Sequence, residues 1–188
     1  TVKLQNSRIE LERGNAQLIA EGHESQPIIL TSLNDNRFGA GYQFDTNGNQ
    51  NDLYNRANPA AFDPDSNIGQ WGGIVVNAAA SASIDNAHIT FAGGIVPIEG
   101  GFASFNPIEV HRGALRLANS RLELNASGDA SSDRNGRGSN DGATVFASSA
   151  QPIVVGYDFR RNEGSVISIN ANSMNDSELG DVGRQSGS

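Results

Sequence analysis

The chain has 188 residues, a formal net charge of −8 and no cysteine. The acidic excess argues against a nucleic-acid partner, because phosphates require a surplus of lysine and arginine. The missing cysteines exclude disulfides, thiolate zinc sites and cysteine nucleophiles. No apolar run approaches the roughly 20 residues that a membrane-spanning helix requires, so no membrane span is expected.

Short segments of alternating apolar and polar residues predict β-strands along most of the chain. Few strong helix formers cluster anywhere, so long helices are not expected. The predicted strands span residues 2–4, 8–11, 16–20, 27–31, 72–76, 82–84, 87–91, 108–110, 114–117, 121–124, 144–146, 153–155 and 165–169. Glycine, asparagine and serine separate them, and glycine and asparagine suit corners because they tolerate left-handed backbone angles.

Two short motifs occur twice in the chain. Asn6–Leu11 returns in almost the same form as Asn119–Leu124, and Ser25–Leu30 returns as Ala150–Val155. Self-similarity in short β-patterned pieces is typical of a solenoid, whose stacked coils bury a continuous core. We therefore predict an all-β chain that forms a single parallel β-helix segment over residues 1–188. A β-sandwich with Greek-key connections is the alternative.

Apolar residues at every second strand position are expected to point into one shared interior. They are Ile9, Leu11, Ile74, Val76, Leu115, Leu117, Leu122, Leu124, Ile167 and Ile169. Two long polar tracts, about residues 34–70 and 126–142, interrupt the strand pattern, and we predict that both are insertions at coil corners. Aromatic residues in the first tract predict that it packs on the solenoid, whereas the second has none and is the better candidate for mobility.

Several strings along the chain resemble a known group of proteins. The strings are Thr31–Gly41, Phe44–Asn47, Trp71–Ile74, Ser83–Ala87, Ile98–Phe102, Ile108–His111 and Ile167–Asn170. Together they look like the right-handed parallel β-helix regions of very large secreted bacterial proteins. The resemblance implies a right-handed coil, an extracellular or cell-surface location, and a structural or adhesive function as one segment of a larger protein. It carries no catalytic residue across.

Oxygen-bearing side chains at every second position of the first tract predict a Ca²⁺ site, since Ca²⁺ takes six to eight oxygen ligands. The predicted ligands are Asp45, Asn47, Asn49, Asn51 and Asp52, joined by Asp63 and Asp65 from the end of the same tract. The spacing is not that of an EF-hand, because the twelfth position counted from Asp45 is Arg56. A solvated, turn-rich loop is the alternative.

A carbohydrate-active β-helix enzyme, either a polysaccharide lyase or a glycosidase, is the alternative to a structural or adhesive role. Such an enzyme needs a pair of acids in a groove. The possible groove acids are Asp35, Asp85, Glu99, Glu109 and Glu123. Lys3 is the only lysine, and a lyase acting on uronates needs clustered basic groups, so we expect no enzymatic activity. His23, His88 and His111 lack metal-motif spacing, and we expect His88 and His111 to stack on adjacent coils.

The two ends of the sequence predict contacts with further coils. Thr1–Leu4 begins directly in strand pattern, and the tail Asn172–Ser188 is too rich in glycine and serine to make a cap. An uncovered coil exposes unpaired backbone groups and apolar side chains. We therefore expect the first end to stack on coils of the parent chain or of another copy. Contacts between copies could propagate as a filament.

Overall fold

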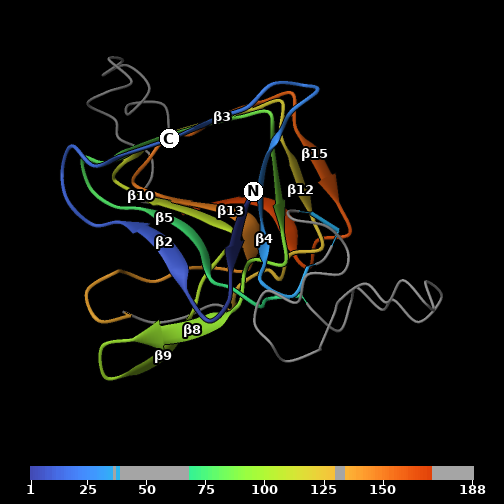
Figure 1. Cartoon of the computed structure of the whole chain (residues 1–188). Coiled ribbons are helices and arrows are strands. Elements are labelled where there is room, and N and C mark those ends of the chain that lie inside the picture. The colour runs from blue at the N-terminus through green and yellow to red at the C-terminus, as the bar shows by residue number, and fades with distance from the viewer. Residues whose placement is uncertain (36, 39–67, 130–133, 171–188) are drawn as a thin grey trace, which may run out of the picture.

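The computed structural model describes residues 1–35, 37–38, 68–129 and 134–170 (Figure 1). Every regular element within these ranges is a β-strand. Sheet A contains, in spatial order, β1 (Val2–Leu4), β4 (Ile28–Ser32), β7 (Ala87–Thr90), β12 (Arg121–Glu123) and β15 (Asp158–Arg160). Sheet B contains β16 (Ser165–Ile169), β13 (Ala143–Ser148), β10 (Ile108–His111), β5 (Gly73–Val76) and β2 (Arg8–Leu11). Sheet C contains β14 (Ile153–Val155), β11 (Ala114–Ala118), β6 (Ser81–Asp85) and β3 (Gln17–Glu21).

Successive strands visit the three sheets in a fixed rotation. From β2 onward the chain passes from sheet B to sheet C to sheet A, and it repeats this order in β5–β7, β10–β12 and β13–β15. All pairs in these sheets are parallel and in register, as the aligned Ile9, Ile74 and Ile108 illustrate. The predicted all-β class is confirmed. The stacked parallel sheets are compatible with a solenoid and differ from the antiparallel sheets of a β-sandwich.

The strand alternation predicted the interior correctly at nine of ten positions. Leu11, Ile74, Val76, Leu115, Leu117, Leu122 and Leu124 belong to one buried cluster, and Ile9 and Ile167 pack against it. Ile169 is the exception, with an exposed fraction of 60%. Its strand, β16, is the last described strand of sheet B, so no other described strand lies beyond it.

The coil corners use left-handed backbone angles. After sheet B, Asn15, Ala79 and Arg112 have φ angles of 68°, 59° and 54°. The Asn15 N–H donates to the Ala79 carbonyl at 2.9 Å, and the Ala79 N–H donates to the Arg112 carbonyl at 3.1 Å. After sheet C, the expected asparagines occupy the corner, since Asn86 and Asn119 have φ angles of 48° and 45°. The corner after sheet B therefore stacks on itself from coil to coil.

Two segments cover the outer face of sheet B. The antiparallel hairpin of β8 (Ile95–Ile98) and β9 (Gly101–Ser104) was not predicted, and it packs Val96 and Ala103 against Val75 of β5. The second polar tract is described at residues 126–129 and 134–142, and the latter segment buries Arg134 and Asn140. That burial argues against the mobility expected for this tract. Strand β15 was also not predicted, and most of the first tract lies outside the described residues.

Replacing Leu117 with alanine should lower the free energy of unfolding by about 2–5 kcal/mol, because it leaves a cavity in a packed core. Leu117 is fully buried. Chemical denaturation measures the change. Ile19→Ala in β3 is the control, since Ile19 is 69% exposed and its truncation should stay within about 0.5 kcal/mol. Equal midpoints for the Leu117 variant and the unaltered chain would contradict the inward assignment.

Candidate functional site

The outer face of sheet B carries two glutamates in one register row. Since Ile9, Ile74 and Ile108 face the core, the next residue of each strand faces outward. That row places Glu10 of β2 and Glu109 of β10 on either side of Val75. The hairpin and residues 134–142 lie over this row, so its charged groups depend on partners from those segments.

Glu109 is a fully buried carboxylate with a complete set of donors. Arg134 donates from Nη1 to Oε1 and from Nη2 to Oε2, each at 2.8 Å. The Asn106 backbone N–H donates to Oε1 at 2.7 Å, and His111 Nε2 lies 3.0 Å from Oε2. Arg134 also donates to the Ser104 carbonyl at 3.0 Å. A bidentate pair with further hydrogen bonds is the arrangement that makes a buried charge tolerable.

The electrostatics of Glu109 follow from these contacts. Burial by itself raises the pKa of Glu109, because a low-dielectric surrounding disfavours the charged carboxylate. The hydrogen bonds from His111 and Arg134, with the positive charge of Arg134, outweigh burial and hold the pKa of Glu109 below its ordinary value. The carboxylate is therefore ionised at neutral pH, and Glu109 fastens residues 134–142 to sheet B.

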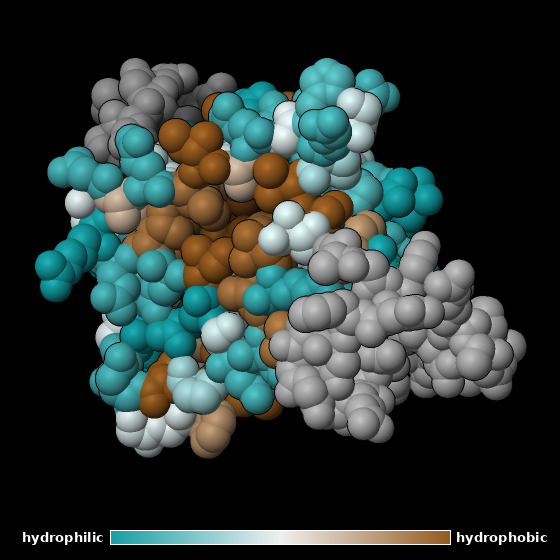
Figure 2. All heavy atoms as spheres, in the orientation of Figure 1, coloured by the Kyte–Doolittle hydropathy of each residue, from teal (hydrophilic) through white to brown (hydrophobic). Residues whose placement is uncertain are grey.

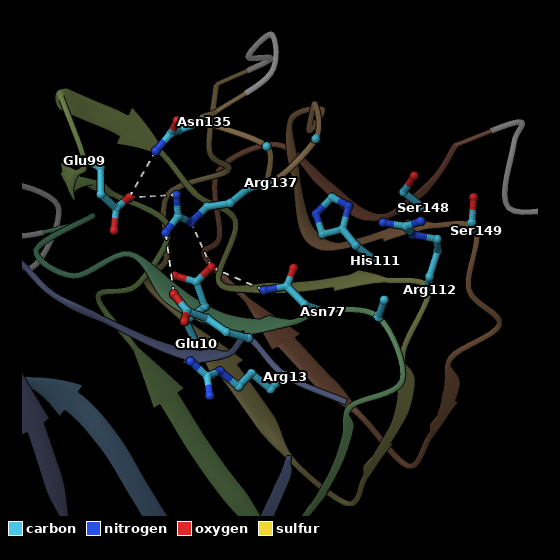
Figure 3. A pocket seen from close by; sticks show the side chains of 14 residues that line it. Glu10, Arg13, Asn77, Glu99, His111, Arg112, Asn135, Arg137, Ser148 and Ser149 are labelled. Carbon is cyan, nitrogen blue, oxygen red and sulfur yellow. Dashed lines mark hydrogen bonds and ion pairs between the residues drawn. The ribbon is translucent and has the colours of Figure 1, made fainter. Parts of the chain in front are cut away.

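Arg137 joins three glutamates at the surface above this network (Figure 3). It donates to Glu10 Oε1 at 2.8 Å and to Glu99 Oε2 at 3.1 Å, and it lies 3.7 Å from Glu12. Arg8 donates to the other oxygen of Glu10 at 2.6 Å. Hydrogen bonds from the Glu99 backbone N–H and from Arg137 lower the pKa of Glu99. Glu10 and Glu99 are thus already held by guanidinium groups.

A groove of ≈ 640 Å³ runs beside this cluster. It is lined by Glu10, Glu12, Arg13, Asn77, Ala78, Glu99, His111, Arg112, Asn135, Gly136, Arg137, Gly138, Ser148 and Ser149. Figure 3 shows the acids gathered around Arg137 on one side of the groove and Arg112 beside Ser148 and Ser149 on the other. All lining residues except Ala78 and the two glycines have polar or charged side chains, so the groove suits a ligand rich in hydrogen-bonding groups.

The five acids predicted as groove residues do not gather at one place. Glu99 and Glu109 lie at the outer face of sheet B. Asp35 accepts two hydrogen bonds from Arg37, at 2.8 and 2.9 Å, next to sheet A. Asp85 pairs with Arg116 at 2.7 Å at the end of β6 in sheet C. Glu123 lies on β12 in sheet A. Three of the five acids therefore belong to other faces.

His88 and His111 lie in different sheets. His88 pairs with Arg121 in sheet A, and His111 pairs with Ser148 in sheet B, so the expected stacking of the two histidines is wrong.

The predicted calcium ligands Asp45, Asn47, Asn49, Asn51, Asp52, Asp63 and Asp65 all lie outside the described residues. The calcium site stays a prediction. Within the described ranges, no three histidine, aspartate or glutamate side chains are grouped as metal ligands.

Sequence reasoning missed the arginines that organise this face. Arg134 and Arg137 lie in a polar tract that alternation does not describe, and their partners lie up to 127 residues away in sequence. One signal was available. Arg134 and Arg137 are basic residues in an otherwise small and polar tract, and Glu10 and Glu109 occupy outward positions in apolar strands. Such glutamates require counter-charges if anything covers them.

The chain matches no protein-family model, no curated protein and no solved structure. Within the part of the chain that the structure describes, no helix is long and apolar enough to cross a membrane. The functional conclusion therefore depends on the geometry of the sheets and of the groove.

Glu109→Gln should lower the free energy of unfolding at pH 7 by about 3–5 kcal/mol, because Arg134 would stay buried without its counter-charge. The pKa of Glu109 is lowered on folding, so its stabilisation is complete above the ordinary value of 4.5 and is lost as pH falls through the lower folded value. The difference in unfolding free energy between the variant and the unaltered chain should therefore disappear in that acidic range. Denaturation at several pH values measures it.

Glu24→Gln is the matched control, because Glu24 is exposed and its neutralisation should leave stability nearly unchanged. A Glu109→Gln variant as stable as the Glu24→Gln variant at pH 7 would contradict the role assigned to the buried pair.

Proposed function

We propose that the chain is a segment of a right-handed parallel β-helix with a structural or adhesive role, part of a larger bacterial protein of the cell surface or of a fibre. The fixed rotation of strands and the stacked left-handed corners support the β-helix. The resemblance of its strings to secreted β-helix regions supports the location. The observation that carries the proposal is that, within the described residues, no strand covers either end of the three sheets.

Among the residues that the structure describes, no strand pairs with the outer edges of the first three strands. Strands β1, β2 and β3 are each the last strand of their sheet. Figure 2 shows hydrophobic side chains gathered at the centre of the face on which these strands lie. A hollow of ≈ 420 Å³ there is lined in part by Ile9, Leu11, Ala16 and Leu18. Open edges and apolar surface of this kind favour the addition of further strands.

The opposite end offers matching edges. Strands β14, β15 and β16 end sheets C, A and B there. A second copy whose β1 and β2 lie against β15 and β16 would continue sheets A and B in their existing rotation. Sheet C has four described strands where sheets A and B have five, so β14 and β3 of that copy would not be adjacent. This contact joins two different surfaces and need not close, so it propagates as a filament. We commit to a second copy as the occupant, and coils of the parent chain are the other outcome of the test.

The isolated segment should self-associate in a concentration-dependent way, and light scattering with electron microscopy measures this. One row of sheet A runs from Lys3 through Thr31, Thr90 and Glu123 to Arg160. In a head-to-tail contact, Arg160 of one copy would lie against Lys3 of the next, and like charges directly opposite each other across strands repel. Arg160→Glu should therefore strengthen association, and the double variant Lys3→Glu with Arg160→Glu should weaken it again.

Ser83→Lys is the control, since Ser83 lies on β6, an inner strand of sheet C. A monodisperse monomer at high concentration would refute self-assembly and leave the parent chain as the source of further coils. Equal association by the Arg160→Glu variant and the double variant would refute the proposed register.

A carbohydrate-active enzyme remains the second candidate function, because Glu10 and Glu99 both line the groove. Incubation with a panel of acidic and neutral polysaccharides tests it. New reducing ends that disappear in Glu99→Gln would establish it.

We also propose that the first polar tract binds Ca²⁺, on the basis of its alternating side-chain oxygens. Calorimetric titration should give a heat of binding that is lost in Asp45→Ala. Asp141→Ala, in the second polar tract, should leave the titration unchanged. A chain without any calcium effect on heat or on melting temperature would return the tract to a solvated loop.

A further inference from the structure

The groove beside sheet B contains two arginines that form no ion pair within the described part of the chain. Seven described arginines form ion pairs with carboxylates, namely Arg8, Arg37, Arg116, Arg121, Arg134, Arg137 and Arg160. Arg13 and Arg112 are exposed and form no ion pair with any described residue. Both line the same groove. In a chain with a net charge of −8, two uncompensated guanidinium groups at one groove favour an external anion.

The fold sets the spacing of these two arginines. Arg13 follows β2 and Arg112 follows β10, and β5 lies between those strands in sheet B. Their corners are therefore two coils apart, roughly 10 Å at the usual distance between neighbouring strands. The intervening corner carries the short side chains of Asn77 and Ala78, which also line the groove. Arg13 and Arg112 thus lie on either side of a part of the groove that is lined by short side chains.

The Arg112 side chain is placed by an unusual backbone. Arg112 has a φ of 54°, and its N–H donates to the Ser148 carbonyl at 3.0 Å. Glycine or asparagine would satisfy this left-handed corner at less cost. Figure 3 shows the arginine side chain beside Ser148 and Ser149, at the side of the groove away from Arg137. A guanidinium fork beside hydroxyl groups suits a carboxylate.

The remaining lining narrows the ligand class. Glu12, Asn77, Asn135, Ser148 and His111 offer hydrogen-bonding groups, and Ala78 is the one apolar side chain among the lining residues. A peptide partner would require apolar pockets for its anchors. A polymer with more than one charge per unit, such as a heavily sulfated polysaccharide, would be repelled more strongly by the three glutamates of the lining and by the net charge. A chain of sugars with spaced carboxylates and many hydroxyls fits both the arginines and the acids.

We propose that this groove binds a carboxylate-bearing polysaccharide, with Arg13 and Arg112 each holding a carboxylate. The surrounding hydroxyl and amide groups donate hydrogen bonds to sugar hydroxyls and accept hydrogen bonds from them. The surrounding carboxylates accept hydrogen bonds from sugar hydroxyls. Arg13 lines both this groove and the hollow at the first end of the sheets. Binding is therefore measured at concentrations at which light scattering shows single copies, which separates it from self-assembly.

Calorimetry or biolayer interferometry with alginate and polygalacturonate tests the proposal on the full chain. Binding should weaken as salt is raised. Arg13→Gln and Arg112→Gln should each weaken binding about tenfold or more, because each removes a charged hydrogen-bond donor. Arg116→Gln is the matched control, since it removes one positive charge from sheet C, and it should change affinity by less than about twofold. The substitutions at the exposed Arg13 and Arg112 should leave the denaturation midpoint unchanged.

Comparison with neutral dextran, sulfated dextran and poly-glutamate shows which ligand chemistry the groove prefers. Preference for the uronate polymers over all three supports the proposal. Equal binding of poly-glutamate would replace the polysaccharide with an acidic peptide, and stronger binding of sulfated dextran would replace the carboxylate with a sulfate. No binding of uronate polymers at low salt, or equal losses in Arg112→Gln and Arg116→Gln, would overturn the site.

Discussion

In-register parallel pairing is the constraint on which the rest of this structure depends. Because side chains alternate across a strand, one register assigns every second residue of each coil to the interior and its neighbour to the outer face. The row that contains Ile74 and Ile108 fills the core, and the next row carries Glu10 and Glu109 outward. A slip by one residue would bury the carboxylates among the aliphatic side chains. The hydrophobic core and the charged outer face of sheet B are therefore two consequences of one register.

The hairpin and residues 134–142 cover the outer face of sheet B and bury charged side chains that would otherwise face water. A carboxylate such as Glu109 can lie under a hairpin and a loop only with a counter-charge, and Arg134 supplies it with two hydrogen bonds of 2.8 Å. The same arrangement occurs at sheet A, where the buried Asp35 is held by Arg37. Specific ion pairs thus fix segments that contribute few apolar side chains, and they define one wall of the groove.

The groove combines neutralised acids with two uncompensated arginines, although the whole chain is acidic. Long-range charge would repel most polyanions, so any binding of an anion has to come from local geometry. Stacked corners provide that geometry, because they hold Arg13 and Arg112 at a separation set by the spacing of strands. Stacked parallel sheets with a lateral groove are compatible with the proposed protein that extends in one direction and binds at its side.

The sequence by itself determined the all-β class, thirteen of the sixteen strands, the interior positions and the asparagine corners at Asn86 and Asn119. These features follow from alternation and from backbone preferences, which act over a few residues. The β8–β9 hairpin was missed although Gly100 and Gly101 offered a turn signal. Only the tertiary structure decided that Arg134 meets Glu109 and that Arg137 meets Glu10, 127 residues away. Charge pairing across such distances depends on where the chain folds back, and no local pattern encodes it.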